Sequence, residues 1–415
     1  MNDLRIDGGH LLARLEELGT VGRREDGSCC RLALTDEDRQ GRDLVVSWMR
    51  ELGLQVQVDR IGNLIALRPG AEDLAPVMTG SHIDTVATGG KYDGNYGVLA
   101  GLEAMRALDR AGIRTRRPLA VAVFTNEEGA RFQLDMLGSL VYAGGLELER
   151  ALALRATDGP ALGAELERIG YNGTLAPGAI VPHAFVELHI EQGPVLDREG
   201  GDLGAVHTLQ GISWTEVTLR GVANHAGTTP MALRHDAGYG AARTACFVRE
   251  LTRELGGDQV GTVGSLRFAP GLVNVIPREA VLTVDLRNPD EDLLCKAERR
   301  LDAFLDRLAG EEGLEIATRR LARSGPVTFD PGVVRAIEAA AGSLGRKARP
   351  MVSGAGQDAQ MLARICPAAM IFVPSIGGIS HSPAERTGPG HLELGANVLL
   401  RTLLALAECV RPLPG

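Results

Sequence analysis

The chain has 415 residues, of which 44% are hydrophobic and 23% are charged, a composition typical of folded globular proteins rather than disordered ones. Its formal net charge is -9 and only 4% of its residues are aromatic, which argues against nucleic-acid binding, because that function needs basic patches and stacking rings. No apolar run approaches the roughly 20 residues of a membrane-spanning helix, and no basic and apolar leader opens the chain, so a cytoplasmic protein without membrane attachment is expected.

The six cysteines show no CxxC spacing, and a chain of this length can bury a core without disulfides. We therefore expect reduced thiols. The residues concerned are Cys29, Cys30, Cys246, Cys295, Cys366 and Cys409.

Helical and strand-like segments alternate through the first half of the chain. A helix is expected over 35–52, where Thr35 can cap the first turn, apolar residues recur at i, i+4 spacing and Gly53 suits the stop. The other expected elements are strands at 55–58, 63–67, 76–79, 119–124 and 184–188 and a helix at 98–108. This alternation predicts an α/β domain with a largely parallel sheet, which binds ligands at the carboxyl ends of its strands.

The pattern changes near residue 209 and changes back near residue 325. Between these points the expected order is β-α-β-β-α-β, which is the ferredoxin-like pattern of a separate small domain. Its expected elements are strands at 215–219, 263–268, 280–286 and 314–318 and helices at 236–255 and 290–308. Helices at 331–344, 357–365 and 392–409 and a strand at 369–373 then resume the α/β pattern. The predicted domains are therefore a larger domain formed by 1–208 and 327–415, with 209–326 inserted into it.

Histidines and carboxylates cluster just after several predicted strands and once more near the end of the chain. The clusters are GSHID at 80–84 with KYDGN at 91–95, NEEG at 126–129, ELHIEQ at 187–192 and SHSP at 380–383. Imidazole and carboxylate without thiolate suit Zn, Mn, Co or Ni rather than a cysteine-type structural zinc site. Asp84 is expected to hold the far ring nitrogen of His82 and fix its tautomer. Strand ends converge at one sheet edge, so the clusters together predict a metal centre.

Six ordered motifs resemble those of the M20 metallopeptidase superfamily. They are GSHIDT, GGKYDGNYGV, NEEGARF, ELHIEQGPVL, ANHAGTTPM and GISHSPAE. The resemblance runs from the predicted 35–52 helix to the last helix. It is most specific to the amidase (hydantoinase/carbamoylase) branch, which includes N-carbamoyl-L-amino-acid hydrolases, allantoate amidohydrolases, β-ureidopropionases and ureidoglycolate amidohydrolases. It implies an α/β catalytic domain with an inserted ferredoxin-like α+β domain that serves as lid and dimerisation module.

The resemblance also implies a binuclear metal centre. Asp93 would bridge two divalent ions, of which one also takes His82 and His189 and the other takes Glu128 and His381. Zinc is the first expectation for both ions, and Mn, Co or Ni fit the same ligands.

Glu127 would be the general base that takes a proton from the attacking water and returns it to the leaving amine. The substrate would be a small ureido acid, namely an N-carbamoyl-L-amino acid or a close analogue, which loses ammonia on hydrolysis. Gln192 and the Gly356 loop would contact this substrate from the catalytic domain. In the small domain, His225 would stabilise the oxyanion, Asn274 would bind the ureido end and Arg287 would clamp a carboxylate. Because the small-domain residues would reach the site of the partner subunit, the resemblance implies a homodimer.

Other interpretations remain open. Within the same fold, the substrate could be allantoate, ureidoglycolate or N-carbamoyl-β-alanine, or a dipeptide or N-acyl amino acid. A non-catalytic binding protein and a dimerising scaffold are alternatives from other classes. The GAGQDA segment at 354–359 fits the pattern GxGxxA, but no acidic residue follows at the position a dinucleotide site requires, so the loop is expected to approach a substrate carboxylate or the metal edge instead.

Overall fold

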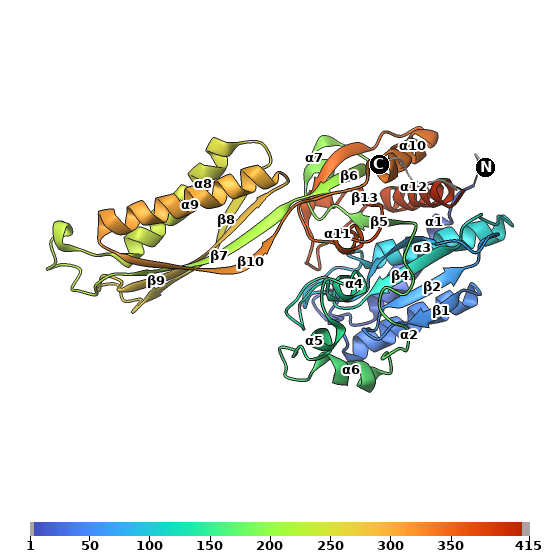
Figure 1. Cartoon of the computed structure of the whole chain (residues 1–415), viewed down its shortest axis with the longest axis horizontal. Helices are drawn as coiled ribbons and strands as arrows, with labels where there is room; N and C mark the ends of the chain where they lie inside the picture. The colour runs from blue at the N-terminus through green and yellow to red at the C-terminus, as the bar shows by residue number, and fades with distance from the viewer. Residues whose placement is uncertain (1–3, 409–415) are drawn as a thin grey trace. The chain divides into compact units, whose positions relative to one another are not determined.

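The computed structural model describes residues 4–408, and these form two compact units (Figure 1). Unit 1 contains the described residues up to His207 and those from Phe329 onward. Unit 2 is Thr208–Thr328. Cys409, the expected end of the last helix, lies outside the described residues, and the five other cysteines are all free thiols, as expected.

The centre of unit 1 is a mixed sheet. Its strands are β1 (Gln55–Val58), β2 (Leu64–Arg68), β3 (Val77–His82), β4 (Leu119–Phe124), β5 (Ala184–Ile190), β6 (Gly204–Leu209), β11 (Val327–Thr328), β12 (Arg349–Ser353) and β13 (Ala368–Val373). Their order is β1-β2-β4-β3-β5-β13-β6-β11, and β12 also pairs with β6. The end of β6 and the short β11, both counted in unit 2 above, extend this sheet at one edge. The predicted α/β class is confirmed.

Only the middle of this sheet is parallel, so the prediction of a largely parallel sheet was wrong. The neighbours β4, β3, β5 and β13 run parallel to one another. On one side β1 and β2 are antiparallel, because five residues between them allow only a tight turn, and β2 is also antiparallel to β4. On the other side β6 is antiparallel to β13. The four parallel strands end at the same edge, and this edge carries the polar clusters.

Helices cover both faces of the sheet. Those of unit 1 are α1 (Gly8–Thr20), α2 (Asp36–Glu51), α3 (Asn95–Arg110), α4 (Leu137–Tyr142), α5 (Leu148–Leu152), α6 (Leu162–Ile169), α7 (Val195–Glu199), α10 (Pro331–Ser343), α11 (Asp358–Leu362) and α12 (Pro389–Glu408), with a 3-10 turn η2 (Ile376–Gly378). α3 and α12 pack together against one face, where Leu188 lies, and α11 packs with α4 against the other, where Glu187 lies.

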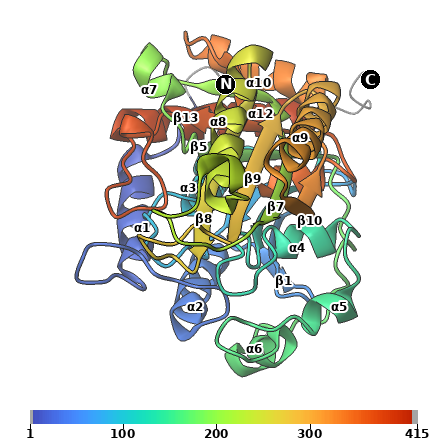
Figure 2. The same ribbon diagram turned by 90° about the vertical axis from the view of Figure 1, so that its left-hand side faces the viewer.

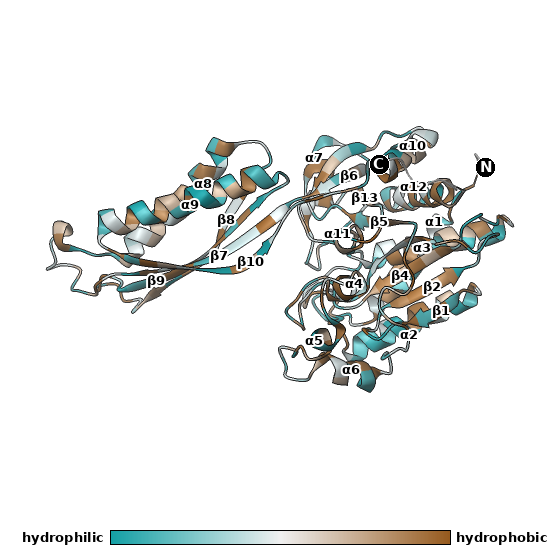
Figure 3. Ribbon diagram, in the orientation of Figure 1, coloured by the Kyte–Doolittle hydropathy of each residue, from teal (hydrophilic) through white to brown (hydrophobic). Residues whose placement is uncertain are grey.

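The core of unit 1 lies between these layers. All six residues of β4 are fully buried, and its hydrophobic colour continues into β2 in Figure 3. Burying one of its leucine, valine or phenylalanine side chains contributes roughly 1.5–3 kcal/mol to stability. This continuous burial on both faces explains why β4 reads as an unbroken apolar run in the sequence.

The helix α2 confirms the prediction for 35–52, because the side chain of Thr35 accepts a hydrogen bond from the backbone N–H of Asp38. Its inner face carries a fully buried ion pair between Arg42 Nε and Asp38 Oδ2 at 2.8 Å. The Arg42 guanidinium also donates to the carbonyl of Gly62 and to the hydroxyl of Thr125. The pair therefore ties α2 to the end of β4, and removing one partner from such a buried pair typically costs about 3–5 kcal/mol.

Unit 2 is a four-stranded antiparallel sheet with two helices, α8 (Ala237–Leu255) and α9 (Glu291–Glu312). Its strands are β7 (Gly211–Arg220), β8 (Val260–Ala269), β9 (Glu279–Asn288) and β10 (Glu315–Ser324), with a 3-10 turn η1 (Met231–Leu233). The sheet order β10-β7-β9-β8 and the chain order confirm the ferredoxin-like prediction. Figures 1 and 2 show α8 and α9 together on one face of this sheet, and their apolar faces share one buried core with it.

Several elements were missed or misjudged in length. The elements that were not predicted are α1, the short helices α4, α5, α6 and α7, and the strands β6, β11 and β12, and α11 is shorter than the predicted helix at 357–365. α1 begins at Gly8 after the N-cap Asp7, whose side chain accepts the backbone N–H of His10. No helix within 4–408 is both long and apolar enough to cross a bilayer.

Candidate metal centre

Strand ends place most of the predicted ligands at one edge of the unit 1 sheet. His82 is the last residue of β3, and His189 lies next to the last residue of β5. Glu127 and Glu128 follow β4 after a short turn. Because these strands are parallel neighbours, their carboxyl ends meet, as ligand sites in open α/β sheets generally do.

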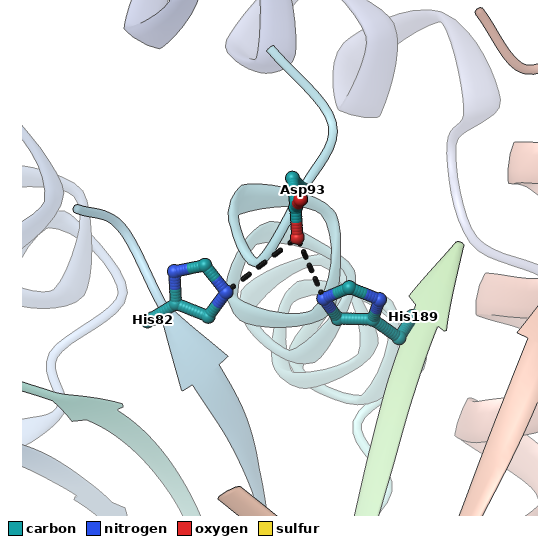
Figure 4. A group of neighbouring side chains, drawn as sticks. All are labelled: His82, Asp93 and His189. Carbon is teal, nitrogen blue, oxygen red and sulfur yellow. Dashed lines mark ion pairs between the residues drawn. The ribbon is translucent and has the colours of Figure 1, made fainter. Parts of the chain in front are cut away.

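The first ligand group consists of His82, Asp93 and His189, all of them buried (Figure 4). His82 Nε2 lies 3.6 Å and His189 Nε2 lies 3.1 Å from Asp93 Oδ1. Two donors bound tetrahedrally to one ion at about 2.1 Å would be about 3.4 Å apart. The spacing therefore fits a shared divalent cation.

Hydrogen bonds at the far ring nitrogens strengthen this fit. His82 Nδ1 lies 2.9 Å from the carbonyl oxygen of Asp84, and His189 Nδ1 lies 2.8 Å from that of Ile190. A carbonyl only accepts, so both Nδ1 atoms carry protons, and in its neutral form each ring presents an Nε2 lone pair. These lone pairs face a carboxylate oxygen, an arrangement that a cation between them stabilises.

The second ligand group consists of Asp93, Glu128 and His381. His381 Nε2 lies 3.3 Å from Asp93 Oδ2 and 3.3 Å from Glu128 Oε2. Asp93 thus turns one oxygen to each group, which is the geometry of a bridging carboxylate. His381 is 49% exposed, so the second group is open to solvent on one side.

Glu127 lies beside the first ligand group without belonging to it. Its Oε2 atom is 3.4 Å from His82 Nε2, and the residue is only 7% exposed. Burial, together with Asp358, Glu128 and Asp93, raises the pKa of Glu127 well above its usual range, although His82 opposes this.

The crowding of carboxylates and imidazoles shifts the pKa values of the ligands as well. Burial and Asp93 raise the pKa of Glu128 to about 7, and the hydrogen bond to Asp93 raises the pKa of His381 to about 9. Burial opposes ionisation of Asp93, but hydrogen bonds from the histidines hold its pKa well below the usual range. Burial lowers the pKa values of His82 and His189, but the carboxylates outweigh it and raise both. Such perturbed groups gather at functional sites.

Unusual backbone geometry accompanies the site. Asn126, Gln192 and His381 have φ angles of 56°, 58° and 53°, which non-glycine residues adopt only at a cost. Gly94 has a φ of 63°, and a Cβ atom there would lie 2.4 Å from His82 Nε2. Only glycine therefore lets the Asp93 loop approach the His82 ring.

Asp84 holds the far ring nitrogen of His82, as expected, but it does so through its backbone rather than its side chain. The backbone carbonyl of Asp84, not its carboxylate, meets His82 Nδ1. The two carboxylate oxygens instead accept the backbone N–H groups of Glu127 and Glu128 at 3.2 Å and 3.3 Å. The side chain points to the neighbouring strand end and orients the Glu127–Glu128 turn.

The substrate-binding residues proposed for unit 1 lie near the ligands to different degrees. Gln192 Nε2 donates to Asp93 Oδ2 at 2.8 Å and lies 3.4 Å from His381 Nε2. Gln192 Oε1 accepts a hydrogen bond of 2.8 Å from Gln357 Nε2. Gly356, next to Gln357, is half-buried, and the side chains nearest to it are those of Met136 and Gln360, neither of which is a ligand.

Sequence reasoning missed three polar residues around this edge. Asp358 is fully buried, and burial with the nearby Glu187 raises its pKa well above the usual range. Gln357 holds Gln192, as described above. Glu385 is buried and contacts the Asp93 loop. Each of them belongs to a quoted motif or to the 354–359 loop, but their partners are distant in sequence and gave no local signal.

Unit 2 carries the three remaining candidates. His225 is exposed, and its Nδ1 atom accepts the backbone N–H groups of Gly227 and Thr228. Its proton therefore lies on Nε2, which can donate. Asn274 is exposed on the loop that pairs with the His225 loop. Arg287 on β9 forms an ion pair with Asp285 at 2.9 Å.

The chain is similar to known proteins over most of its length. The family model described as "Peptidase family M20/M25/M40" matches residues 78–405. The chain is 42% identical to an N-carbamoyl-L-amino-acid amidohydrolase of Rhizobium meliloti over 98% of both chains. It is 40% identical to an N-carbamoyl-L-amino acid amidohydrolase of Geobacillus stearothermophilus, over 97% of this chain and 99% of that relative. The crystal structure of a hydantoinase/carbamoylase family amidase from Burkholderia multivorans superimposes with a TM-score of 0.95 at 44% identity, covering 98% of this chain and 99% of the other.

Proposed function

The chain belongs to peptidase family M20/M25/M40 and, within it, to the hydantoinase/carbamoylase amidase branch, and from this premise we propose that it hydrolyses the ureido C–N bond of an N-carbamoyl-L-amino acid. The enzyme is a hydrolase of the carbamoylase amidase family. The observation that carries the proposal is the sharing of Asp93 between two His/carboxylate groups, with the buried Glu127 beside them. The products would be the amino acid, carbon dioxide and ammonia.

Two divalent ions would occupy the two ligand groups, with zinc as the first candidate and Mn, Co or Ni as alternatives. When bound, such a pair of ions lowers the pKa of a water molecule and polarises the scissile carbonyl. The protein residues supply the rest of the chemistry. Asp93 fixes the spacing between the two groups, and the carbonyls of Asp84 and Ile190 hold the histidine rings in the ligating tautomer.

Glu127 is the proposed general base. It would accept a proton from the attacking water at its carboxylate and deliver it to the departing nitrogen. Its position supports this role, because its side chain borders the first ligand group while the backbone bonds to Asp84 hold the turn in place. Glu128 next to it faces His381 instead, so the two adjacent glutamates would have different roles.

Polar side chains from both units would bind the substrate. Gln192 offers an amide group at the ligand edge, and the Gly356 loop would lie against the substrate. In unit 2, the Nε2–H group of His225 would donate to the oxyanion, Asn274 would bind the ureido end and Arg287 would bind the carboxylate. Arg287 would then exchange part of its contact with Asp285 for the substrate.

The proposed enzyme is a homodimer in which the unit 2 residues complete the partner's site. Large apolar side chains are exposed on the two paired segments that carry His225 and Asn274. They are Val222, Met231, Leu233, Leu272 and Val273, with exposed fractions from 55% to 102%. Exposed apolar clusters of this kind mark protein interfaces.

Mixing two inactive variants tests this arrangement. If His225 acts in the partner's site, a Glu127→Gln chain paired with a His225→Ala chain has one intact site. Random reassociation of equal amounts should restore about a quarter of wild-type activity, since half the dimers are mixed and each has one good site. Activity that stays at the level of the separate variants would place His225 in its own subunit's site or outside catalysis.

The substrate is tested with chelator-treated enzyme that is reloaded separately with Zn, Mn, Co or Ni. Ammonia release is measured with N-carbamoyl-L-amino acids, their D-forms, N-carbamoyl-β-alanine, allantoate and ureidoglycolate. We expect the highest kcat/KM with an N-carbamoyl-L-amino acid. A higher kcat/KM with another ureido acid would reassign the substrate. A dipeptide and an N-acetyl amino acid serve as controls, with the released amine as the readout, and cleavage of these controls alone would refute the proposed bond.

A further inference from the structure

Glu385 is a buried carboxylate at the metal centre that belongs to neither ligand group. It is 4% exposed and lies between η2 and α12, four residues after His381 in the motif GISHSPAE. A buried carboxylate is retained only where other groups compensate for its lost hydration. The contacts of Glu385 show which parts of the centre provide this compensation.

One oxygen of Glu385 holds the loop that carries Asp93. Oε1 accepts the backbone N–H groups of Tyr92 and Asp93 at 3.0 Å and 3.2 Å. The loop passes so closely that a Cβ atom on Gly90 would lie 2.1 Å from Oε1. The GGKYDG segment therefore wraps around the Glu385 carboxylate, although the two are separated by 292 positions in sequence.

The other oxygen faces the loop that carries His381. Oε2 lies 3.0 Å from the hydroxyl of Ser380, and the same hydroxyl lies 3.2 Å from Asp93 Oδ2. Ser380 has one proton to donate, so it serves one of these carboxylates at a time. Through these contacts Glu385 and Ser380 connect the backbone and the side chain of Asp93 to the residue before His381.

The two ligand groups depend on this connection to different extents. In the first ligand group, His82 and His189 lie within strands of the central sheet and are fixed by its hydrogen bonds. In the second ligand group, Asp93 and the half-exposed His381 both come from loops. A clamp between the loops therefore matters most for the second group.

We propose that Glu385 is a positioning residue of the metal centre: it ties the Asp93 loop to the His381 loop and thereby sets the metal affinity of the second ligand group. This inference rests on the proposed metal-dependent function. Residues that hold metal ligands in place typically change metal affinity by about 10- to 100-fold when they are replaced.

The test is a Co²⁺ titration of chelator-treated full-length protein, followed by calorimetry and by the visible absorption of bound Co²⁺. Wild type should bind two ions per chain. Glu385→Ala should weaken the weaker of the two by at least about tenfold and alter its absorption, while the tighter ion changes much less. Glu385→Gln should restore affinity, because its amide oxygen can accept both N–H groups and its NH₂ group can donate to Ser380.

Two further variants approach the clamp without removing the carboxylate. Gly90→Ala should displace Glu385 through the added methyl group and reproduce the loss. Ser380→Ala removes only the hydroxyl and should cause a smaller loss in the same direction. Both remain informative if Glu385→Ala does not fold, as judged by circular dichroism.

Glu103→Ala is the matched control. Glu103 is also 4% exposed and also accepts a backbone N–H group, that of Asp7, but it lies on α3 and contacts His10. Two affinities equal to wild type in folded Glu385→Ala, or an equal loss in Glu103→Ala, would overturn the inference. Wild-type protein that binds no Co²⁺ would refute the metal-dependent function itself, which distinguishes the two failures.

Discussion

Glu127→Gln is expected to lower kcat for the ureido substrate by about 100- to 10,000-fold, the usual contribution of a positioned general base. Glutamine has nearly the same shape as glutamate, but its amide cannot accept a proton from water. Because Glu127 belongs to neither ligand group, the variant should keep the wild-type metal content. Ammonia release under saturating substrate and elemental analysis of the purified protein measure the two quantities.

The matched control for this prediction is Glu103→Gln, which makes the same change at another buried glutamate, outside the centre, and should leave kcat close to wild type. A Glu127→Gln enzyme with a kcat within about threefold of wild type would remove Glu127 from the general-base role. A variant that loses its metal along with its activity would instead make Glu127 a ligand. The metal content distinguishes the two roles, because Glu127 Oε2 lies only 3.4 Å from the ligand atom His82 Nε2.

Asp93→Ala is expected to remove both metal ions and all measurable turnover. One carboxylate oxygen faces each ligand group, so the substitution takes a ligand from both at once. Each group is then left with two other donors, too few for a typical site of three or four protein ligands. The loss should appear as metal content near zero after dialysis and as amidase activity at background.

Single-histidine variants provide the comparison for Asp93. His189→Ala should weaken only the ion of the first ligand group, and His381→Ala only that of the second. Each should therefore retain one ion per chain under conditions in which Asp93→Ala retains none. Retention of one tightly bound ion by Asp93→Ala would contradict the bridging role and assign Asp93 to a single group.

Local sequence patterns predicted most of the elements that build the centre. The Thr35 cap gave the start of α2, the apolar run 119–124 gave β4 and the β-α-β-β-α-β order gave the fold of unit 2. These predictions were confirmed because capping, burial periodicity and turn composition act over a few residues. The convergence of histidines and carboxylates was also expected, since carboxyl ends of parallel strands meet at one edge.

Predictions that depended on a specific distant partner were less successful. Asp84 was correctly expected to hold His82, but the bonds from its carboxylate to the backbone of Glu127 and Glu128, after another strand, were not predicted. The sheet was expected to be largely parallel, yet antiparallel strand pairs lie on both sides of its parallel middle. Neither result is encoded in a local pattern, because each depends on the order in which strands pair.

The sequence by itself determined the family, the residue types of the centre and most of the elements that carry them. Ordered motifs and short-range patterns such as caps and apolar runs can be identified without knowledge of distant contacts. Only the tertiary structure decided that Glu385 lies against the Asp93 loop and that Ser380 connects both carboxylates. The physical reason is that such contacts join loops almost 300 positions apart, and strand pairing and helix packing, rather than either loop's own residues, bring those loops together.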